Sequence, residues 1–303
     1  MSLIRLRAMM LLEGVIAARL RHPSNPEAPM AVLEQIQAFS RQYGRQLRVG
    51  SWNWRYYRLG SGSPILWLTG GLRRAALGFD FMQRLAAQHI VIAPDYPPVD
   101  SIDDFRSAFD AILQAESVDR FALGGQSYGG LLAQAYLACR PQSVERLILS
   151  SSGPADYGAA WLPVEFLFIA LVRILPERLT KRLLAGGLLR FISLPDAGRP
   201  EWEHAVTSVL QDDLTRLDVV SHFAVAADLI RKRLVTPDAY TDWRGCVVVL
   251  QAANDPTQTP KDLPRYEKLF RRPARVLDMG EMGHTASLSD AGRYTELLEQ
   301  ALA

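Results

Sequence analysis

Short, uninterrupted apolar runs recur along most of the chain, separated by segments in which apolar residues follow helical spacing. Runs of this length are typical of strands buried on both faces of a parallel sheet. Alternation of such strands with helices predicts an α/β fold, with a mostly parallel twisted sheet and helices on both faces. The predicted strands are residues 65–68, 90–93, 121–123, 147–149, 247–250 and 276–277, and the predicted helices are residues 79–88, 102–116, 128–138, 263–270 and 294–302.

The first 47 residues depart from this alternation. Residues 1–20 combine three arginines with helical apolar spacing, residues 22–29 hold three prolines, and residues 32–43 again have helical spacing, which Gly44 is expected to end. The first apolar run is too short for a secretory signal or a membrane span, and serine is scarce for a transit peptide. We predict a helical extension over residues 1–47, whose first helix lies on the domain or on a membrane surface.

A second departure lies between the predicted strands 147–149 and 247–250. Residues 150–246 contain no strand-like run and follow helical patterns, and such a length is too great for a loop. We therefore predict an inserted helical cap over residues 154–242. The α/β core then comprises residues 48–153 and 243–303, and it opens on a half-buried strand in which Trp52, Trp54 and Tyr56 alternate with polar residues.

The start of the predicted cap, residues 161–175, is rich in large apolar side chains. Glu165 and Arg173 argue against a membrane span. The segment is therefore interpreted as a lid over an apolar pocket, as a helix that touches lipid, or as the core of the cap itself. In the first interpretation, Trp161 and Phe166 contact the substrate.

Composition narrows the class of protein. With 49% apolar and 22% charged residues among 303, the chain has the composition of a globular protein with a sizeable core. Thirty-four basic and 32 acidic side chains leave a net charge of +2, which gives no indication of a nucleic-acid partner. Cys139 and Cys246 have no disulfide or metal-ligand spacing and are predicted to be free, buried thiols in a reducing compartment, the cytoplasm.

One motif carries recognisable chemistry. Residues 124–130 read Gly-Gly-Gln-Ser-Tyr-Gly-Gly, directly after a predicted strand and before a predicted helix. Gly-x-Ser-x-Gly in this setting is typical of a nucleophile elbow, a sharp turn that exposes the serine hydroxyl at the start of a helix. Ser127 is therefore the candidate nucleophile. An ordinary glycine-rich turn with a solvated serine is the alternative.

A nucleophilic serine needs a base and an orienting acid. His284 lies in a glycine-rich loop after the last predicted strand, and Asp255 lies in a loop after strand 247–250. Asp156, after strand 147–149, is the alternative acid, and Asp255 could instead only initiate an Asp-Pro turn. The carboxyl ends of parallel strands share one sheet edge, so these residues are expected to meet. Of the other histidines, His22 and His89 are expected to lie outside the site, and His204 and His222 fall inside the predicted helical insertion.

An oxyanion formed at Ser127 needs backbone N–H donors. Tyr128, at the start of the helix, is one candidate, and Gly71, in the loop after strand 65–68, is the other. Gly70 and Leu72 remain alternatives to Gly71. No residue pattern indicates a metal ion or a cofactor.

Taken together, the elbow, the order serine, acid, histidine and the insertion resemble the α/β-hydrolase superfamily over residues 48–303. Within it the chain looks most similar to the maspardin branch, in Trp52-Asn53-Trp54, in residues 95–98 and 103–106, and in the apolar start of the insertion. Maspardin-like proteins are known mainly for binding. This chain keeps the elbow, Asn-Asp-Pro and Gly-His, which resemble the esterases and lipases and imply an enzyme without a cofactor.

The sequence thus favours a cytoplasmic serine hydrolase that cleaves a small ester with an apolar acyl or alkyl group through Ser127, His284 and Asp255. Its expected partners are that substrate and, at most, a membrane surface. Two alternatives remain: a maspardin-like binding protein, and a hydrolase of amide or carbon-carbon bonds.

Overall fold

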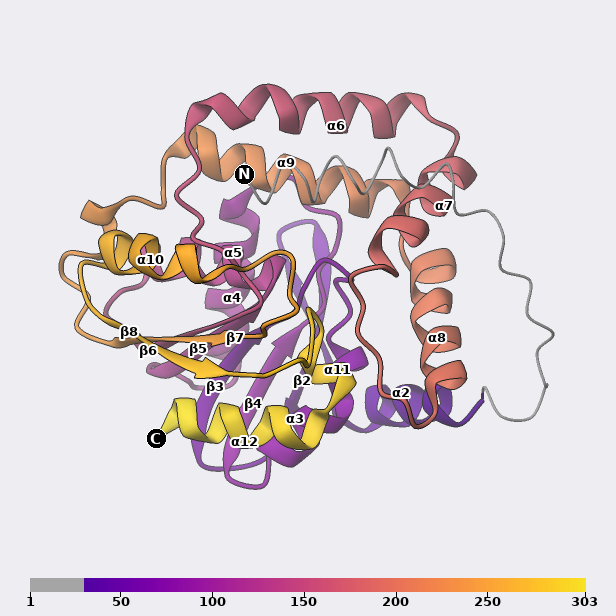
Figure 1. Cartoon of the computed structure of the whole chain (residues 1–303), viewed down its shortest axis with the longest axis horizontal. Helices are drawn as coiled ribbons and strands as arrows, with labels where there is room; N and C mark the ends of the chain where they lie inside the picture. Colours follow the sequence, from indigo (N-terminus) through magenta and orange to yellow (C-terminus); the bar gives the residue numbers. More distant parts are fainter. Residues whose placement is uncertain (1–29) are drawn as a thin grey trace.

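The computed structural model describes residues 30–303. Within them, one eight-stranded sheet has the order β1-β2-β4-β3-β5-β6-β7-β8 (Figure 1). Strand β2 runs antiparallel to both of its neighbours, and all other pairs are parallel, which confirms the predicted mostly parallel sheet. The strands are β1 (Gly44–Val49), β2 (Trp52–Leu59), β3 (Ser63–Leu68), β4 (His89–Pro94), β5 (Phe121–Gln126), β6 (Val144–Ser150), β7 (Cys246–Gln251) and β8 (Ala274–Asp278).

Helices cover both faces of this sheet (Figure 1). One face carries α2 (Met30–Tyr43), α3 (Phe79–Leu85) and α12 (Ala291–Leu302), and the other carries α4 (Ile102–Ala115), α5 (Tyr128–Cys139) and α10 (Leu263–Phe270). Successive strand residues point to opposite faces, so Ile65 and Trp67 pack in one core and Leu66 and Leu68 in the other. This is why the central strands are apolar without interruption.

The first strand of the sheet, β1, was not predicted. It pairs with β2 as a hairpin at the sheet edge, and only Leu47 and Val49 are half-buried while its other residues are exposed. A strand with so few apolar positions has no clear period-two signal. Helix α2 does end before Gly44, as predicted, where a side chain would lie 2.4 Å from the carbonyl oxygen of Ser40.

Between β6 and β7 the chain forms helices rather than strands. Helix α6 lies along α9 at one end of the sheet, and α8 packs against α2 (Figure 1). No helix in residues 30–303 is both long and apolar enough to cross a bilayer. The helices of this segment are α6 (Leu162–Ile174), α7 (Glu177–Leu188), α8 (Arg199–Ser208), the π-helix η4 (Val209–Asp213) and α9 (Arg216–Lys232), with 3-10 turns at η3 (Ala159–Trp161) and η5 (Pro237–Tyr240).

Three short helices complete the described chain: η2 (Ala75–Gly78), η6 (Pro260–Asp262) and α11 (Ala286–Ser289). The helix predicted over residues 1–20 lies outside the described residues. The two cysteines are free, as predicted, and Cys139 is half-buried. The predicted burial of Cys246 is wrong, because this residue is the first of β7 and lies exposed where the strand begins.

Candidate active site

Ser127 lies on the sharp turn between β5 and α5. Its backbone has φ 53°, a left-handed conformation that is uncommon for a residue with a side chain. Two of the neighbouring glycines are required by space. A Cβ at Gly129 would lie 1.9 Å from the carbonyl oxygen of Leu68, and one at Gly125 would lie 2.3 Å from the carbonyl oxygen of Gly129. The turn therefore has the tight strand-to-helix geometry that the motif predicts.

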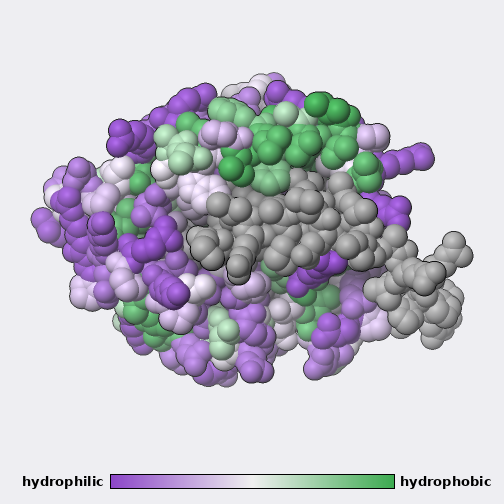
Figure 2. Space-filling view, turned by 45° about the horizontal axis from the view of Figure 1, so that its top comes forward, coloured by the Kyte–Doolittle hydropathy of each residue, from purple (hydrophilic) through white to green (hydrophobic). Residues whose placement is uncertain are grey.

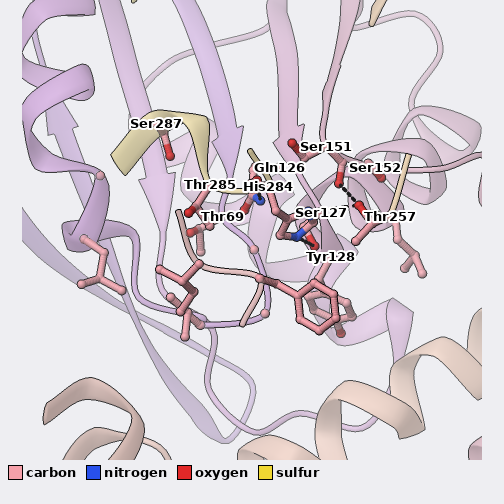
Figure 3. A pocket seen from close by; sticks show the side chains of 18 of the residues that line it. Thr69, Gln126, Ser127, Tyr128, Ser151, Ser152, Thr257, His284, Thr285 and Ser287 are labelled. Atoms are coloured by element: carbon pink, nitrogen blue, oxygen red, sulfur yellow. Dashed lines mark hydrogen bonds between the residues drawn. The ribbon is translucent and has the colours of Figure 1, made fainter. Parts of the chain in front are cut away.

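The side chains of Ser127, His284 and Asp255 form one hydrogen-bonded row. The Oγ of Ser127 lies 3.0 Å from Nε2 of His284, and both Asp255 carboxylate oxygens lie 3.1 Å from Nδ1 of the same ring. A proton on Nδ1 is donated to the carboxylate, which leaves Nε2 free to accept from the serine hydroxyl. The structure thus brings together the three residues that the sequence singled out (Figure 3 shows Ser127 and His284).

Two loops are joined to hold this row. The side chain of Asn254 accepts the N–H of Gly283 at 2.8 Å and donates to the carbonyl of Glu281 at 2.9 Å, so the loop before His284 is attached to the loop that carries Asp255. The side-chain amide of Gln126 donates to the carbonyl of His284 at 2.9 Å. The backbone of the loop that carries His284 is therefore held by the residues that precede Ser127 and Asp255.

The sequence did not point to Thr257, which completes the surroundings of Asp255. Its hydroxyl lies 2.8 Å from Oδ1 of Asp255 and 3.0 Å from Nδ1 of His284, and its backbone N–H donates to Oδ1 at 2.8 Å. Asp255 therefore does shape a local turn, and it also contacts the histidine. The sequence signal that could have identified Thr257 is its position two residues after Asp255, where an aspartate side chain commonly accepts the backbone N–H in a local turn.

Asp255 has a fully buried side chain. Burial raises the pKa of Asp255, but hydrogen bonds from His284 and Thr257 lower it by more, so its net pKa lies below the ordinary value. The carboxyl group is therefore ionised at neutral pH. A buried carboxylate beside Nδ1 stabilises the protonated imidazole.

The alternative acid, Asp156, lies elsewhere. It forms an ion pair of 2.6 Å with Arg265, whose side chain is 48% exposed. The hydrogen bonds of the His284 Nδ1 atom go to Asp255 and Thr257.

A cavity of about 160 Å³ opens beside Ser127 and His284 (Figure 3). Hydroxyl groups of Thr69, Ser151, Ser152 and Ser287 form part of its lining. The rest of the wall is mainly apolar and is drawn from distant parts of the chain: Trp67, Leu72, Ala75, Leu77, Phe81, Leu131, Phe191, Ile192, Phe223 and Leu288. The space suits a small group with apolar character beside the serine hydroxyl.

The two residues predicted to donate to an oxyanion, Gly71 and Tyr128, both line this cavity. Tyr128 is the first residue of α5, where backbone N–H groups have no acceptor within the helix. A Cβ at Gly71 would meet nothing closer than 3.6 Å, whereas one at Gly70 would lie 2.3 Å from the side-chain oxygen of Gln126. Leu72 also lines the cavity.

His222, which the sequence placed in the helical insertion but did not single out as a site residue, belongs to the same wall. Its ring stacks on that of Tyr128, with 4.1 Å between centroids and 27° between planes. It also supplies the atom nearest to a Cβ at Gly71. The spacing of residues along α9 did not indicate that this histidine lines the cavity, because the side of α9 that faces the cavity depends on how the helix packs.

Trp161 and Phe166, the predicted substrate contacts, are not among the residues that line the cavity. Helix α6 turns Phe168, Ile169 and Val172 toward α9, and this leaves Phe166 pointing outward with 52% of its surface exposed. Trp161 packs at the edge of the core and contacts Tyr157. From the segment between β6 and β7, the aromatic residues that line the cavity are instead Tyr157, Phe191, His222 and Phe223.

Within residues 30–303, no group of three or more histidine, cysteine, aspartate or glutamate side chains could hold a metal ion.

Comparison with known proteins agrees with this architecture. No curated protein sequence matches the chain significantly. Among solved structures, Cfl2 from Burkholderia cenocepacia is 19% identical with a TM-score of 0.67, over 85% of this chain and 94% of that one. A thermophilic esterase from Thermogutta terrifontis is 16% identical with a TM-score of 0.69, over 86% and 97%. The enol-lactonase from Burkholderia xenovorans LB400 is 17% identical with a TM-score of 0.65, over 85% and 99%.

At such identities these likenesses concern the fold alone. The model of the alpha/beta hydrolase family matches residues 50–297, which is most of the chain. The sheet order, the turn at Ser127 and this match lead to one conclusion: the chain belongs to the alpha/beta hydrolase family.

Proposed function

We propose that this α/β-hydrolase is a serine hydrolase that cleaves esters with a small apolar acyl or alkyl group. The observation that carries the proposal is the row Ser127, His284, Asp255, with 3.0 Å between Oγ and Nε2. A hydroxyl group is a poor nucleophile until a base accepts its proton, and this contact supplies the base.

The proposed reaction has two halves. Ser127 attacks the ester carbonyl while Nε2 of His284 accepts the hydroxyl proton, and the same proton then goes to the departing alcohol. Water next attacks the acyl carbon while Nε2 of His284 accepts one of its protons; the bond to the Ser127 oxygen then breaks, His284 returns the proton to that oxygen, and the acid is released. Throughout, Asp255 holds the ring through Nδ1, and the N–H groups of Tyr128 and Gly71 are proposed to stabilise the oxyanion.

Preference for an apolar group rests on the cavity wall. Phe81, Phe191 and Phe223 line it, and within residues 30–303 neither an arginine nor a lysine is among its lining residues. An esterase and an enol-lactonase share this fold, and the choice of an ester over an amide or a carbon-carbon bond is part of the proposal. In this proposal, residues 154–242 act as a cap over the cavity. The free thiols favour the cytoplasm as its location.

A fluorophosphonate probe tests the proposal without knowledge of the substrate, because it reacts only with an activated serine. We expect stoichiometric labelling at Ser127 at mildly alkaline pH, and loss of labelling in Ser127→Ala and His284→Ala. Ser287→Ala removes another hydroxyl of the same cavity and should leave labelling unchanged. A folded wild-type chain that stays unlabelled would overturn the proposal and favour a binding function instead.

A panel of acyl esters of increasing chain length, compared with matched amides, then separates the bond classes. Short apolar esters should be cleaved fastest, because the cavity is small. Faster cleavage of amides would contradict the assignment of the bond.

A further inference from the structure

Helix α6 is apolar on both of its sides. One side, with Phe168, Ile169 and Val172, packs against α9. The opposite side is exposed and mainly apolar, with Phe166 at 52%, Leu167 at 57%, Leu171 at 37% and Ile174 at 81%, and it carries one exposed charged residue, Arg173, in its last turn. A water-exposed helix face normally carries polar side chains, so this face calls for an explanation.

These residues form a continuous stripe rather than scattered contacts. Positions 163, 166, 167, 170, 171 and 174 are exposed and recur at helical spacing, which places them along one broad face of the helix. Figure 2 shows hydrophobic side chains gathered over α6. We name this stripe, made of Pro163, Phe166, Leu167, Ala170, Leu171 and Ile174, the α6 face.

Exposed apolar residues are concentrated around this segment. Of the eight large exposed hydrophobic residues in the described chain, seven lie between residues 166 and 217. Leu179 of α7 and Leu217 of α9 belong to this group, and the side chain of Arg216 donates to the carbonyl of Arg173 at the end of α6. The eighth, Val276, lies on strand β8.

The charges beside the α6 face are mostly basic. Residues 162–190 contain five basic side chains and two acidic ones, and of the acidic ones Glu165 is fully buried. Arg173, Arg178 and Arg182 are exposed. A surface with bulky apolar residues and flanking arginines complements a bilayer that has anionic headgroups, into which the apolar side chains insert while the arginines contact phosphate.

We propose that the α6 face binds an anionic lipid bilayer, with α6 lying in the plane of the headgroups. The inner side of the helix stays packed on α9. An ordinary interfacial helix has a polar side that faces water, and here the rest of the protein lies on that side instead. This binding is independent of the hydrolase activity proposed above.

Vesicle flotation of the full chain tests this. We expect the protein to float with vesicles of phosphatidylcholine mixed with phosphatidylglycerol, and to float less with phosphatidylcholine alone. In the variant Phe166→Ser/Leu167→Ser/Ile174→Ser, binding should fall by more than about tenfold, because each exposed side chain loses apolar area that would be buried in lipid. Val276→Ser, which removes an exposed apolar residue elsewhere, should bind as the wild type does.

Three outcomes would overturn the proposal. The first is a wild-type chain that does not float with either vesicle. The second is a loss of flotation as large in Val276→Ser as in the triple variant. The third combines two results: the wild type does not float, and light scattering shows that the wild type is a dimer whereas the triple variant is a monomer. A second copy of the chain would then cover the α6 face. Circular dichroism and the melting temperature of the triple variant are measured as controls, and both should match those of the wild type because the substituted residues are exposed.

Discussion

Arg73 and Asp218 form a buried ion pair, with 3.4 Å between Nε and Oδ1 and with 1% and 4% of the side chains exposed. Arg73 follows the Gly71 loop, and Asp218 lies in the first turn of α9, so the pair joins the predicted oxyanion loop to the helix that carries His222. The guanidinium also donates to the carbonyl of Pro97 at 2.6 Å and to the hydroxyl of Ser221 at 3.0 Å. These contacts attach α9, which lies over the cavity, to the loop that contains Gly71.

Replacing Arg73 by methionine should lower the free energy of unfolding by about 3 to 5 kcal/mol, because it leaves the Asp218 carboxylate buried without its partner. Urea unfolding measures this change. The double variant Arg73→Met/Asp218→Asn should lose less than the sum of the two single variants, with a coupling of about 1 kcal/mol or more. Arg74→Met, a change of the adjacent arginine, is the control. Strict additivity would show that the pair does not act as a unit.

Asp255→Asn should lower turnover of an ester substrate by roughly a thousandfold or more, because the amide cannot hold the required tautomer of His284. Asp156→Asn should change turnover little, because Asp156 is paired with Arg265. Steady-state kinetics on both variants decide between them. If Asp156→Asn proved the more damaging, the acid would have to be reassigned.

Thr257→Val should reduce turnover by about tenfold or more, because a hydrogen bond to a charged group contributes about 1.5 to 3 kcal/mol and the hydroxyl contacts both Asp255 and His284. Thr257→Ser keeps a hydroxyl at this position and should restore most of the activity. Equal losses in both variants would show that the methyl group, and not the hydroxyl, matters. Thr257 is a positioning residue in this view.

Asp95 lies at the end of β4 and accepts hydrogen bonds from the N–H of Ala75 at 2.7 Å and from the hydroxyl of Tyr57 at 3.2 Å. Burial raises the pKa of Asp95 to about 6. The folded state therefore holds this proton to a higher pH than the unfolded state does. The contribution of Asp95 to stability is greatest below the unfolded pKa, falls as the pH rises toward 6, and is constant above that.

The variant Asp95→Asn has no carboxyl group at this position, so its stability does not show this decrease as the pH rises. The free energy of unfolding of the variant minus that of the wild type should therefore increase by on the order of 2 to 3 kcal/mol between about pH 4 and pH 7. Urea unfolding of both proteins across this range measures the difference, and other carboxylates cancel in it. A difference that stays flat would mean that the pKa of Asp95 is not raised.

The sequence alone determined the α/β class, the central strands and the row of site residues. These features depend on local signals. A strand buried on both faces must be apolar at every position, a turn as tight as the one at Ser127 leaves no space for a side chain at Gly125 or Gly129, and parallel strands bring the residues after their carboxyl ends to one edge. That the loops of Asp255 and His284 meet could therefore be predicted without knowing how the helices pack.

The tertiary structure decided which residues surround that row. Helical spacing could not show which side of α6 faces inward, because both sides are apolar, and so Phe166 was expected in the cavity and lies exposed instead. Phe191, His222 and Phe223 reach the cavity only because α9 and the segment before α8 are placed over the sheet. Strand β1 forms at an edge, where hydrogen bonds to β2 stabilise a strand whose side chains are mostly exposed. In each case the local sequence pattern allows several structures equally well, and contacts between residues far apart in the sequence determine which one forms.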